Sequence, residues 1–208
     1  MKFFYLPLFV FASALFLVSC SDDEPELVPV EIDIFNDLSA PQEGGQGQPI
    51  TGPFTKFNLA TGQVTTSETA WDLAFRGTTI IINGGVETGI ADEPARTGDA
   101  AVYIANGTMS SIAEVDVTLF RQDDSTGPAI PGGSDNGWYN YSGPPTFLIT
   151  PLAGKILVMR THDGNNYAKL EILSYYKGAP DSPDATMDEG RHYTFNYVYN
   201  PNDNVTTF

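Results

Sequence analysis

The 208-residue sequence is poor in cysteine, histidine and basic residues: it has one cysteine, two histidines and ten Lys or Arg side chains. Because Cys20 is the only cysteine, no disulfide can form within the chain, and the fold has to be held by its core. The 26 acidic residues give a net charge of −16. A chain this acidic repels phosphate backbones, which argues against nucleic-acid binding. It also offers no basic patch to anionic lipid head groups.

The short motifs of common catalytic sites are also missing. The sequence contains no Gly-x-Ser-x-Gly, His-Glu-x-x-His or glycine-rich phosphate loop. His162 lies in a turn and His192 stands beside Arg191, so we expect both imidazoles to be uncoordinated surface groups. We therefore predict that the protein is not an enzyme; only an acidic cleft created by folding would change that prediction.

Two acidic segments carry oxygen atoms of the kind that calcium binds. They are Asp123-Asp124-Ser125 and Ser134-Asp135-Asn136-Gly137. Neither has the ligand spacing of an EF-hand loop, so we expect both to be solvated loops and assign no metal site.

The one long apolar run stands at the start of the chain. Lys2 precedes an apolar stretch from Phe3 to Val18, which is short for a membrane span and typical of a signal peptide. The run ends in Leu17-Val18-Ser19-Cys20, which resembles the bacterial lipobox. We predict a lipoprotein signal peptide over residues 1–19 and lipidation of Cys20; the alternative is an ordinary signal peptide that contains a cysteine by chance. Membrane attachment is then expected through the acyl chains alone.

Residues 20–52 are predicted to form the lipid anchor and a mostly flexible acidic tether. The acidic run Ser21–Glu26 resembles the export signal of surface-exposed lipoproteins of the Bacteroidetes, so we expect an outer-membrane protein exposed at the cell surface. One alternating stretch, Val30–Ile34, fits a first strand. Gln42–Pro49 is predicted to be the least structured segment of this tether.

The remainder of the sequence favours strands, because it is rich in aromatic and β-branched residues. Strands are expected at Phe54–Leu59, Trp71–Phe75 and Thr78–Ile82, the last followed by the hairpin signal Asn83-Gly84-Gly85. Helical signal is weak and confined to Ser110–Val115.

The clearest prediction is a hairpin made of Lys155–Thr161 and Tyr167–Tyr176, joined by a turn. Arg191–Tyr199 is expected to be a final strand, with Tyr193, Phe195, Tyr197 and Tyr199 facing the core. Gly127–Gly137 is predicted to be a loop rich in Pro and Gly. These elements predict one all-β domain over residues 53–208, a mostly antiparallel sheet or sandwich.

With these segments placed, the chain resembles the HmuY family of haem-binding lipoproteins of the Bacteroidetes. The likeness runs in order from Phe54 to Asn200. Three segments show the likeness: Trp71–Arg76 with the following β-branched strand, Gly137–Ser142, and the Ile156–Tyr176 hairpin together with the closing strand.

The resemblance implies a β-rich fold of HmuY type that binds haem or a related porphyrin. It further implies that haem is taken from host haemoproteins and passed to a TonB-dependent outer-membrane receptor. The family's pair of histidine ligands is not present at matching positions: Gly143-Pro144-Pro145 stands where the second ligand loop is expected. Near the first, at Thr108–Ser111, Met109 is the one candidate axial ligand; its alternative role is that of an ordinary apolar side chain.

Trp138, Tyr139 and Tyr141 lie beside the expected ligand loop and are candidates to line a haem pocket, although each also suits core packing. Two functions stay open. The first is a haemophore-like lipoprotein. The second is a surface lipoprotein on the same scaffold that lacks haem ligation and binds a protein, a glycan or another small ligand.

Overall fold

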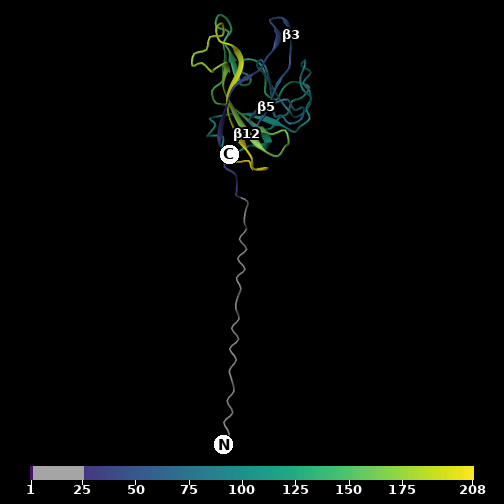
Figure 1. Ribbon diagram of the computed structural model, residues 1–208, viewed down its shortest axis with the longest axis vertical. Coiled ribbons are helices and arrows are strands. Elements are labelled where there is room, and N and C mark those ends of the chain that lie inside the picture. Colours follow the sequence, from purple (N-terminus) through teal and green to yellow (C-terminus); the bar gives the residue numbers. More distant parts are fainter. Residues whose placement is uncertain (2–25) are drawn as a thin grey trace.

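The computed structural model describes Met1 and residues 26–208, and nearly all regular structure there is strand (Figure 1). The described part holds no α-helix, and its helical structure is a 3-10 turn at Val117–Leu119. The strands are β1 (Ile32–Ser39), β2 (Glu43–Gly45), β3 (Gln48–Thr51), β4 (Thr55–Asn58), β5 (Gln63–Thr65), β6 (Leu73–Arg76), β7 (Thr79–Ile82), β8 (Ala101–Asn106), β9 (Tyr139–Tyr141), β10 (Ile149–Pro151), β11 (Lys155–Arg160), β12 (Tyr167–Tyr176) and β13 (Gly190–Asn200).

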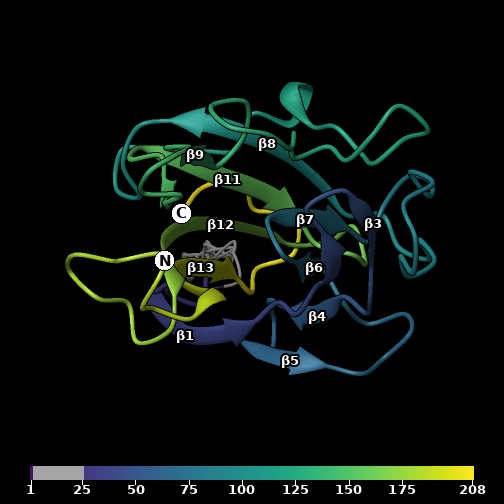
Figure 2. The same cartoon turned by 90° about the horizontal axis from the view of Figure 1, so that it is seen from above.

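Two antiparallel sheets make up the body of the domain. The larger has the order β1-β13-β12-β11-β8 and the smaller the order β5-β4-β6-β7; two short hairpins, β2–β3 and β9–β10, are attached to them. Viewed from above, the strands of the large sheet follow one another across the molecule while β4 to β7 lie beside them (Figure 2). The all-β, mostly antiparallel prediction is confirmed.

The main core lies between the two sheets. Alternate residues of β13 and β12 point inward and meet apolar side chains of β4, β6 and β7. Phe195 is at its centre: it stacks against Phe35 at 5.7 Å and Phe75 at 6.0 Å and meets Phe57 edge-on at 5.3 Å. Offset and edge-to-face contacts of this kind add to the free energy gained from burial.

The outer faces of both sheets are covered as well. Ile156 and Val158 of β11 and Val198 of β13 point away from the main core, beneath a segment that includes Met109 and Val115. On the small sheet, Trp71, Ala74 and Ile81 form a third cluster with Phe54 and Ile90. Strands covered on both sides explain why their sequences are apolar throughout rather than alternating.

The hairpin and final strand predicted from the sequence are present as β11, β12 and β13. Tyr193 and Phe195 are fully buried in the main core, as expected. Thr194 and Val198 are each 3% exposed, so much of the second face of β13 is buried too. Val198 packs in the cluster on the outer face of the large sheet, and the Thr194 hydroxyl accepts a hydrogen bond from the Asp37 amide.

The prediction of a mostly flexible tether up to residue 52 is wrong for residues 32–51. β1 pairs along β13 at the edge of the large sheet, with Phe35 opposite Phe195 and Leu38 opposite Tyr193. Gln42–Pro49 contributes to the β2–β3 hairpin. The partner of β1 lies about 160 residues away in sequence, beyond the reach of local patterns, and the polar composition of Gln42–Pro49 hid the local β2–β3 hairpin.

Asn83-Gly84-Gly85 does not form the hairpin turn that its sequence predicts. The buried Asn83 carboxamide accepts hydrogen bonds from the amides of Thr97 and Gly98 and donates to the Thr69 carbonyl. A side chain at Gly84 would collide with the backbone of Ala100. These residues therefore join a returning loop to the small sheet, and the tight β6–β7 turn lies at Gly77 and Thr78 instead.

No helix forms at Ser110–Val115. The Thr108 and Ser111 hydroxyls bond to each other's backbone in a compact turn, which competes with helical hydrogen bonds. The Lys169 ammonium then fixes this segment to the sheet by donating to the carbonyls of Met109 and Ile112, each at 2.7 Å. Burial lowers the pKa of Lys169.

Among the described residues, no helix is long and apolar enough to cross a membrane. The signal peptide and Cys20 fall outside the described residues, so their assignments remain predictions.

Replacing Phe195 with Ala should lower the free energy of unfolding by about 3–5 kcal/mol, because three neighbouring rings lose their common partner. Urea unfolding followed by tryptophan fluorescence measures the loss. Val64→Ala, at an exposed position of β5, is the control and should change the free energy by less than about 0.5 kcal/mol. A Phe195→Ala protein as stable as this control would contradict the central role of the ring.

Candidate functional site

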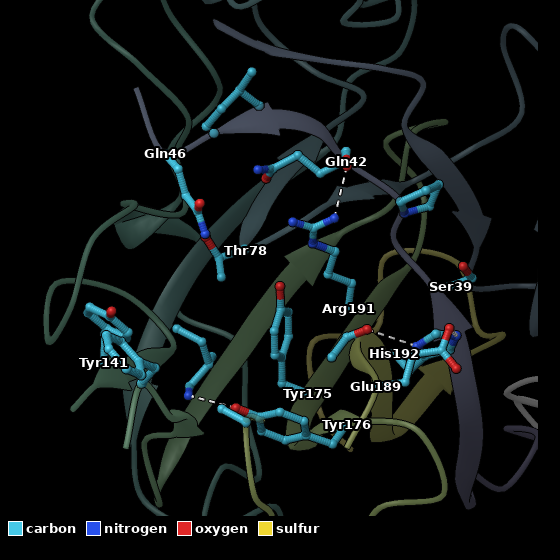
Figure 3. A pocket seen from close by; sticks show the side chains of 17 residues that line it. Ser39, Gln42, Gln46, Thr78, Tyr141, Tyr175, Tyr176, Glu189, Arg191 and His192 are labelled. Carbon is cyan, nitrogen blue, oxygen red and sulfur yellow. Dashed lines mark hydrogen bonds and ion pairs between the residues drawn. The ribbon is translucent and has the colours of Figure 1, made fainter. Parts of the chain in front are cut away.

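A hollow with a volume of about 1030 Å³ lies where the two short hairpins meet the β12–β13 connection (Figure 3). The β2–β3 hairpin supplies Gln46 and Ile50, and the β9–β10 hairpin supplies Tyr141, Phe147 and Ile149. The remaining wall comes from the end of β12 and the start of β13, together with the Gly77–Thr78 turn. A hollow of this size and aromatic lining suits an organic ligand.

Tyr175 and Tyr176 form the aromatic wall of this pocket. Tyr176 is fixed by its hydroxyl, which accepts a hydrogen bond from the Ile149 amide at 3.0 Å. Tyr175 packs edge-on against Tyr193 at 5.5 Å and lies 5.9 Å from Trp138. Burial raises the pKa of Tyr175 to about 12, so this phenol stays neutral at physiological pH.

The polar side of the pocket is made by the first residues of β13. The Arg191 guanidinium donates from Nη1 to the Gln42 carbonyl at 2.9 Å. His192 places Nδ1 3.0 Å from the Gly190 carbonyl oxygen, and its Nε2 lies 3.9 Å from a Glu189 carboxylate oxygen. Since a carbonyl only accepts hydrogen bonds, Nδ1 donates to the Gly190 carbonyl, and Nε2 has no hydrogen-bond partner among the described residues. The expectation that His192 is an ordinary surface histidine is therefore incomplete.

Backbone strain is concentrated around this pocket. Eight non-glycine residues of the described chain have left-handed backbone, and four of them are Asp or Asn, the types that tolerate this conformation. The other four are Gln46, Phe147, Ala179 and Arg191. Three of these four line the pocket: Gln46 (φ 53°), Phe147 (φ 53°) and Arg191 (φ 65°). Residues held in unfavourable conformations cluster at binding and catalytic sites, which makes this pocket the leading candidate.

Of the three residues predicted to line a haem pocket, one lines this pocket and two pack behind its wall. Tyr141 lines the pocket and is 43% exposed. Trp138 and Tyr139 are buried behind the wall, in the alternative role of core packing. Trp138 also donates from its indole to the Thr78 carbonyl at 3.1 Å, which fixes the β6–β7 turn at the pocket edge.

The structure does not bring Met109 into this pocket. Its side chain is 6% exposed and packs against Val115, Ile156 and Val158 on the outer face of the large sheet. Leu157 and Met159, which alternate with those β11 residues, face the main core. Met109 thus has the surroundings of an ordinary apolar methionine, the alternative that its sequence context also offered.

His162 is not the free surface imidazole that its turn position predicts. Its Nδ1 lies 2.8 Å from Oδ1 of Asp72, a fully buried carboxylate that also accepts from the amides of His162 and Leu59. The hydrogen bond to Asp72 raises the pKa of His162 above its ordinary value. The two residues are 90 positions apart, so no local pattern could have indicated the contact.

Asp123 is likewise not in a solvated loop. It is 1% exposed and accepts hydrogen bonds from the amides of Ile82 and Ala129, and from the Arg96 guanidinium at 2.9 Å. Burial raises the pKa of Asp123. These contacts use its oxygens to fasten a loop to the small sheet, and the described residues contain no group of three or more side chains arranged to hold a metal ion.

A family model described as HmuY protein matches residues 53–197. Among solved structures, the chain is similar to a crystal structure of an apo HmuY analog (TFO) from Tannerella forsythia. That similarity has 14% sequence identity and a TM-score of 0.49, and it covers 85% of this chain and 99% of that one. No curated protein matches the sequence significantly.

The His162–Asp72 contact should make folding stability depend on pH. Because the folded-state pKa of His162 is raised above 6.5, its contribution is complete below pH 6.5 and is lost as pH rises through the folded-state value. Urea unfolding of the wild type and of His162→Asn, from about pH 5 to 9, should show a stability difference that shrinks with rising pH. A constant difference would contradict a charged imidazole in the folded state.

Proposed function

The chain belongs to the HmuY family, and from this premise we propose that it binds haem or a related porphyrin in the pocket between its two hairpins. As a haemophore-like lipoprotein it would acquire the ligand, with host haemoproteins as one source, and pass it to a TonB-dependent outer-membrane receptor. The role is binding and transfer rather than catalysis.

The observation that carries the proposal is the coincidence of aromatic lining and strained backbone in one pocket. Tyr141, Phe147, Tyr175 and Tyr176 present ring surface to the hollow, and a porphyrin is a flat aromatic body that buries such surface well. Ligand pockets range from about 300 to 1,000 Å³, so the observed volume is at the large end, as a macrocycle requires.

The donor set at this pocket also suits an iron porphyrin. Haem iron accepts an imidazole nitrogen, and the second nitrogen of such a ligand is commonly hydrogen-bonded to a carbonyl or carboxylate. His192 has this arrangement, with Nδ1 bound to the Gly190 carbonyl and Nε2 without a hydrogen-bond partner among the described residues. His192, in place of Met109, is therefore the residue of this pocket that would hold the iron of a bound haem.

The signal sequence supports the location that the role requires. Lipidation at Cys20 would anchor the domain in the outer membrane, and the acidic residues after it favour display at the cell surface, where ligand capture and delivery to a receptor take place.

The second function, ligand binding without haem, is favoured by one observation. Gly143-Pro144-Pro145 offers no ligating side chain, and Met109 is buried away from the pocket, so both positions that the resemblance implies for iron ligation are without an accessible donor. A protein or glycan ligand would use the same aromatic pocket.

Titrating the purified protein with haemin should give a saturable Soret change at one haem per chain. Tyr141→Ala should weaken binding about fivefold, because an exposed aromatic contact is lost. Met109→Leu is the control and should leave both the affinity and the spectrum unchanged. The absence of any saturable change in the wild type would favour the second function.

Replacing Cys20 with Ala should release the protein from the membrane fraction, since each buried methylene of a lipid anchor contributes about 0.8 kcal/mol to membrane binding. Cell fractionation and detergent-phase partitioning measure the change, with Ser21→Ala as the neighbouring control. Unchanged membrane association of the Cys20→Ala protein would contradict lipidation at this residue.

A further inference from the structure

Arg191 occupies a backbone conformation that suits glycine better than arginine. Its φ is +65° at the second residue of β13, and its carbonyl accepts a hydrogen bond from the Ala40 amide at 2.8 Å, which holds the strained conformation in place. Residues held in such conformations cluster at functional sites, which directs attention to what the Arg191 side chain does at the pocket.

The guanidinium is held at the pocket by groups that do not neutralise it. Gln42 contributes a backbone carbonyl, and Tyr175 reaches toward Arg191 from the pocket wall (Figure 3). The buried phenol of Tyr175 remains protonated, so it adds no negative charge. Several N–H groups of the fork therefore stay available for a ligand.

Arg191 also lacks a carboxylate partner, although acidic residues greatly outnumber basic ones. Arg96 and Arg160 are each paired with an aspartate. Arg191 forms no salt bridge with any described carboxylate, a feature that it shares with Arg76, Arg121, Lys155 and Lys169, but of these five side chains it is the one that lines this pocket. The nearest acid in sequence, Glu189, lines the same pocket but is engaged by Lys177 at 2.8 Å. The Arg191 guanidinium is therefore available to an external anion that enters this aromatic-lined pocket.

Resting on the proposed function, we propose that Arg191 is the specificity-determining residue of the pocket and binds a carboxylate of the porphyrin. Guanidinium and carboxylate form two parallel hydrogen bonds in one plane, which would orient the ligand edge toward Gln42 while the ring contacts Tyr141 and Tyr176. The ligand class is a flat aromatic acid, and recognition of the acid does not require a metal.

The test uses metal-free protoporphyrin IX and its dimethyl ester, followed by porphyrin fluorescence, so that iron ligation makes no contribution. Wild type should bind the free acid at least about tenfold more tightly than the ester, the range expected for a charge-assisted pair. Arg191→Gln should lose this preference, and Arg191→Lys should recover it only in part, because lysine lacks the planar fork.

Two further variants separate ligand recognition from structure. Lys155→Gln removes one positive charge at a residue that does not line this pocket and should bind both compounds as the wild type does. Arg191→Gly should unfold at an equal or higher temperature than the wild type while losing the preference for the acid, because glycine relieves the left-handed strain.

The outcomes distinguish the two proposals. Binding of the free acid by the wild type, with equal affinity in Arg191→Gln, would overturn the role of Arg191 and leave porphyrin binding intact. Failure of the wild type to bind haemin, the free acid or the ester would overturn the proposed function and, with it, this inference.

Discussion

A continuous set of aromatic contacts connects the centre of the core to the wall of the pocket. Phe195 and Phe75 stack inside the sandwich, Tyr193 packs on Phe75 at 5.0 Å, and Trp138 packs on Tyr193 at 5.0 Å. Tyr193 and Trp138 also use their polar atoms, donating to the carbonyls of Gly77 and Thr78. With no disulfide available, this ring packing holds both sheets together and fixes Tyr175 at the pocket.

Buried charged groups have a second structural role, which is to fasten irregular segments over the sheets. Asp123 and Arg96 hold the loop after β7, and Lys169 holds the segment that contains Met109. Asp72 joins the β11–β12 turn to the small sheet through His162. Asp72, Asp123 and Arg96 are satisfied by backbone groups as well as by a side-chain partner, whereas Lys169 donates to backbone carbonyls alone.

Local patterns predicted the parts of the fold whose partners are near in sequence. The β11–β12 hairpin and the aromatic face of β13 follow from alternation and turn residues. The roles of Asn83, His162 and Asp123 could not be predicted in this way, because each depends on a contact with a residue distant in sequence that forms only in the folded protein. The pocket was least predictable: Tyr141 was named, but Gln42 and Arg191 meet from opposite ends of the chain. The one sequence signal there was the adjacent Arg191–His192 pair.

The rigid core and the strained pocket depend on each other. Left-handed conformations at Phe147 and Arg191 are unfavourable in isolation and persist only where surrounding contacts determine them. Here the Tyr176–Ile149 hydrogen bond fixes the β9–β10 hairpin on one side of the pocket. The pairing of β1 with β13 fixes the opposite side. The pocket is therefore formed before any ligand arrives, and binding need not order its walls. Such pre-organisation lowers the entropic cost of binding a ligand.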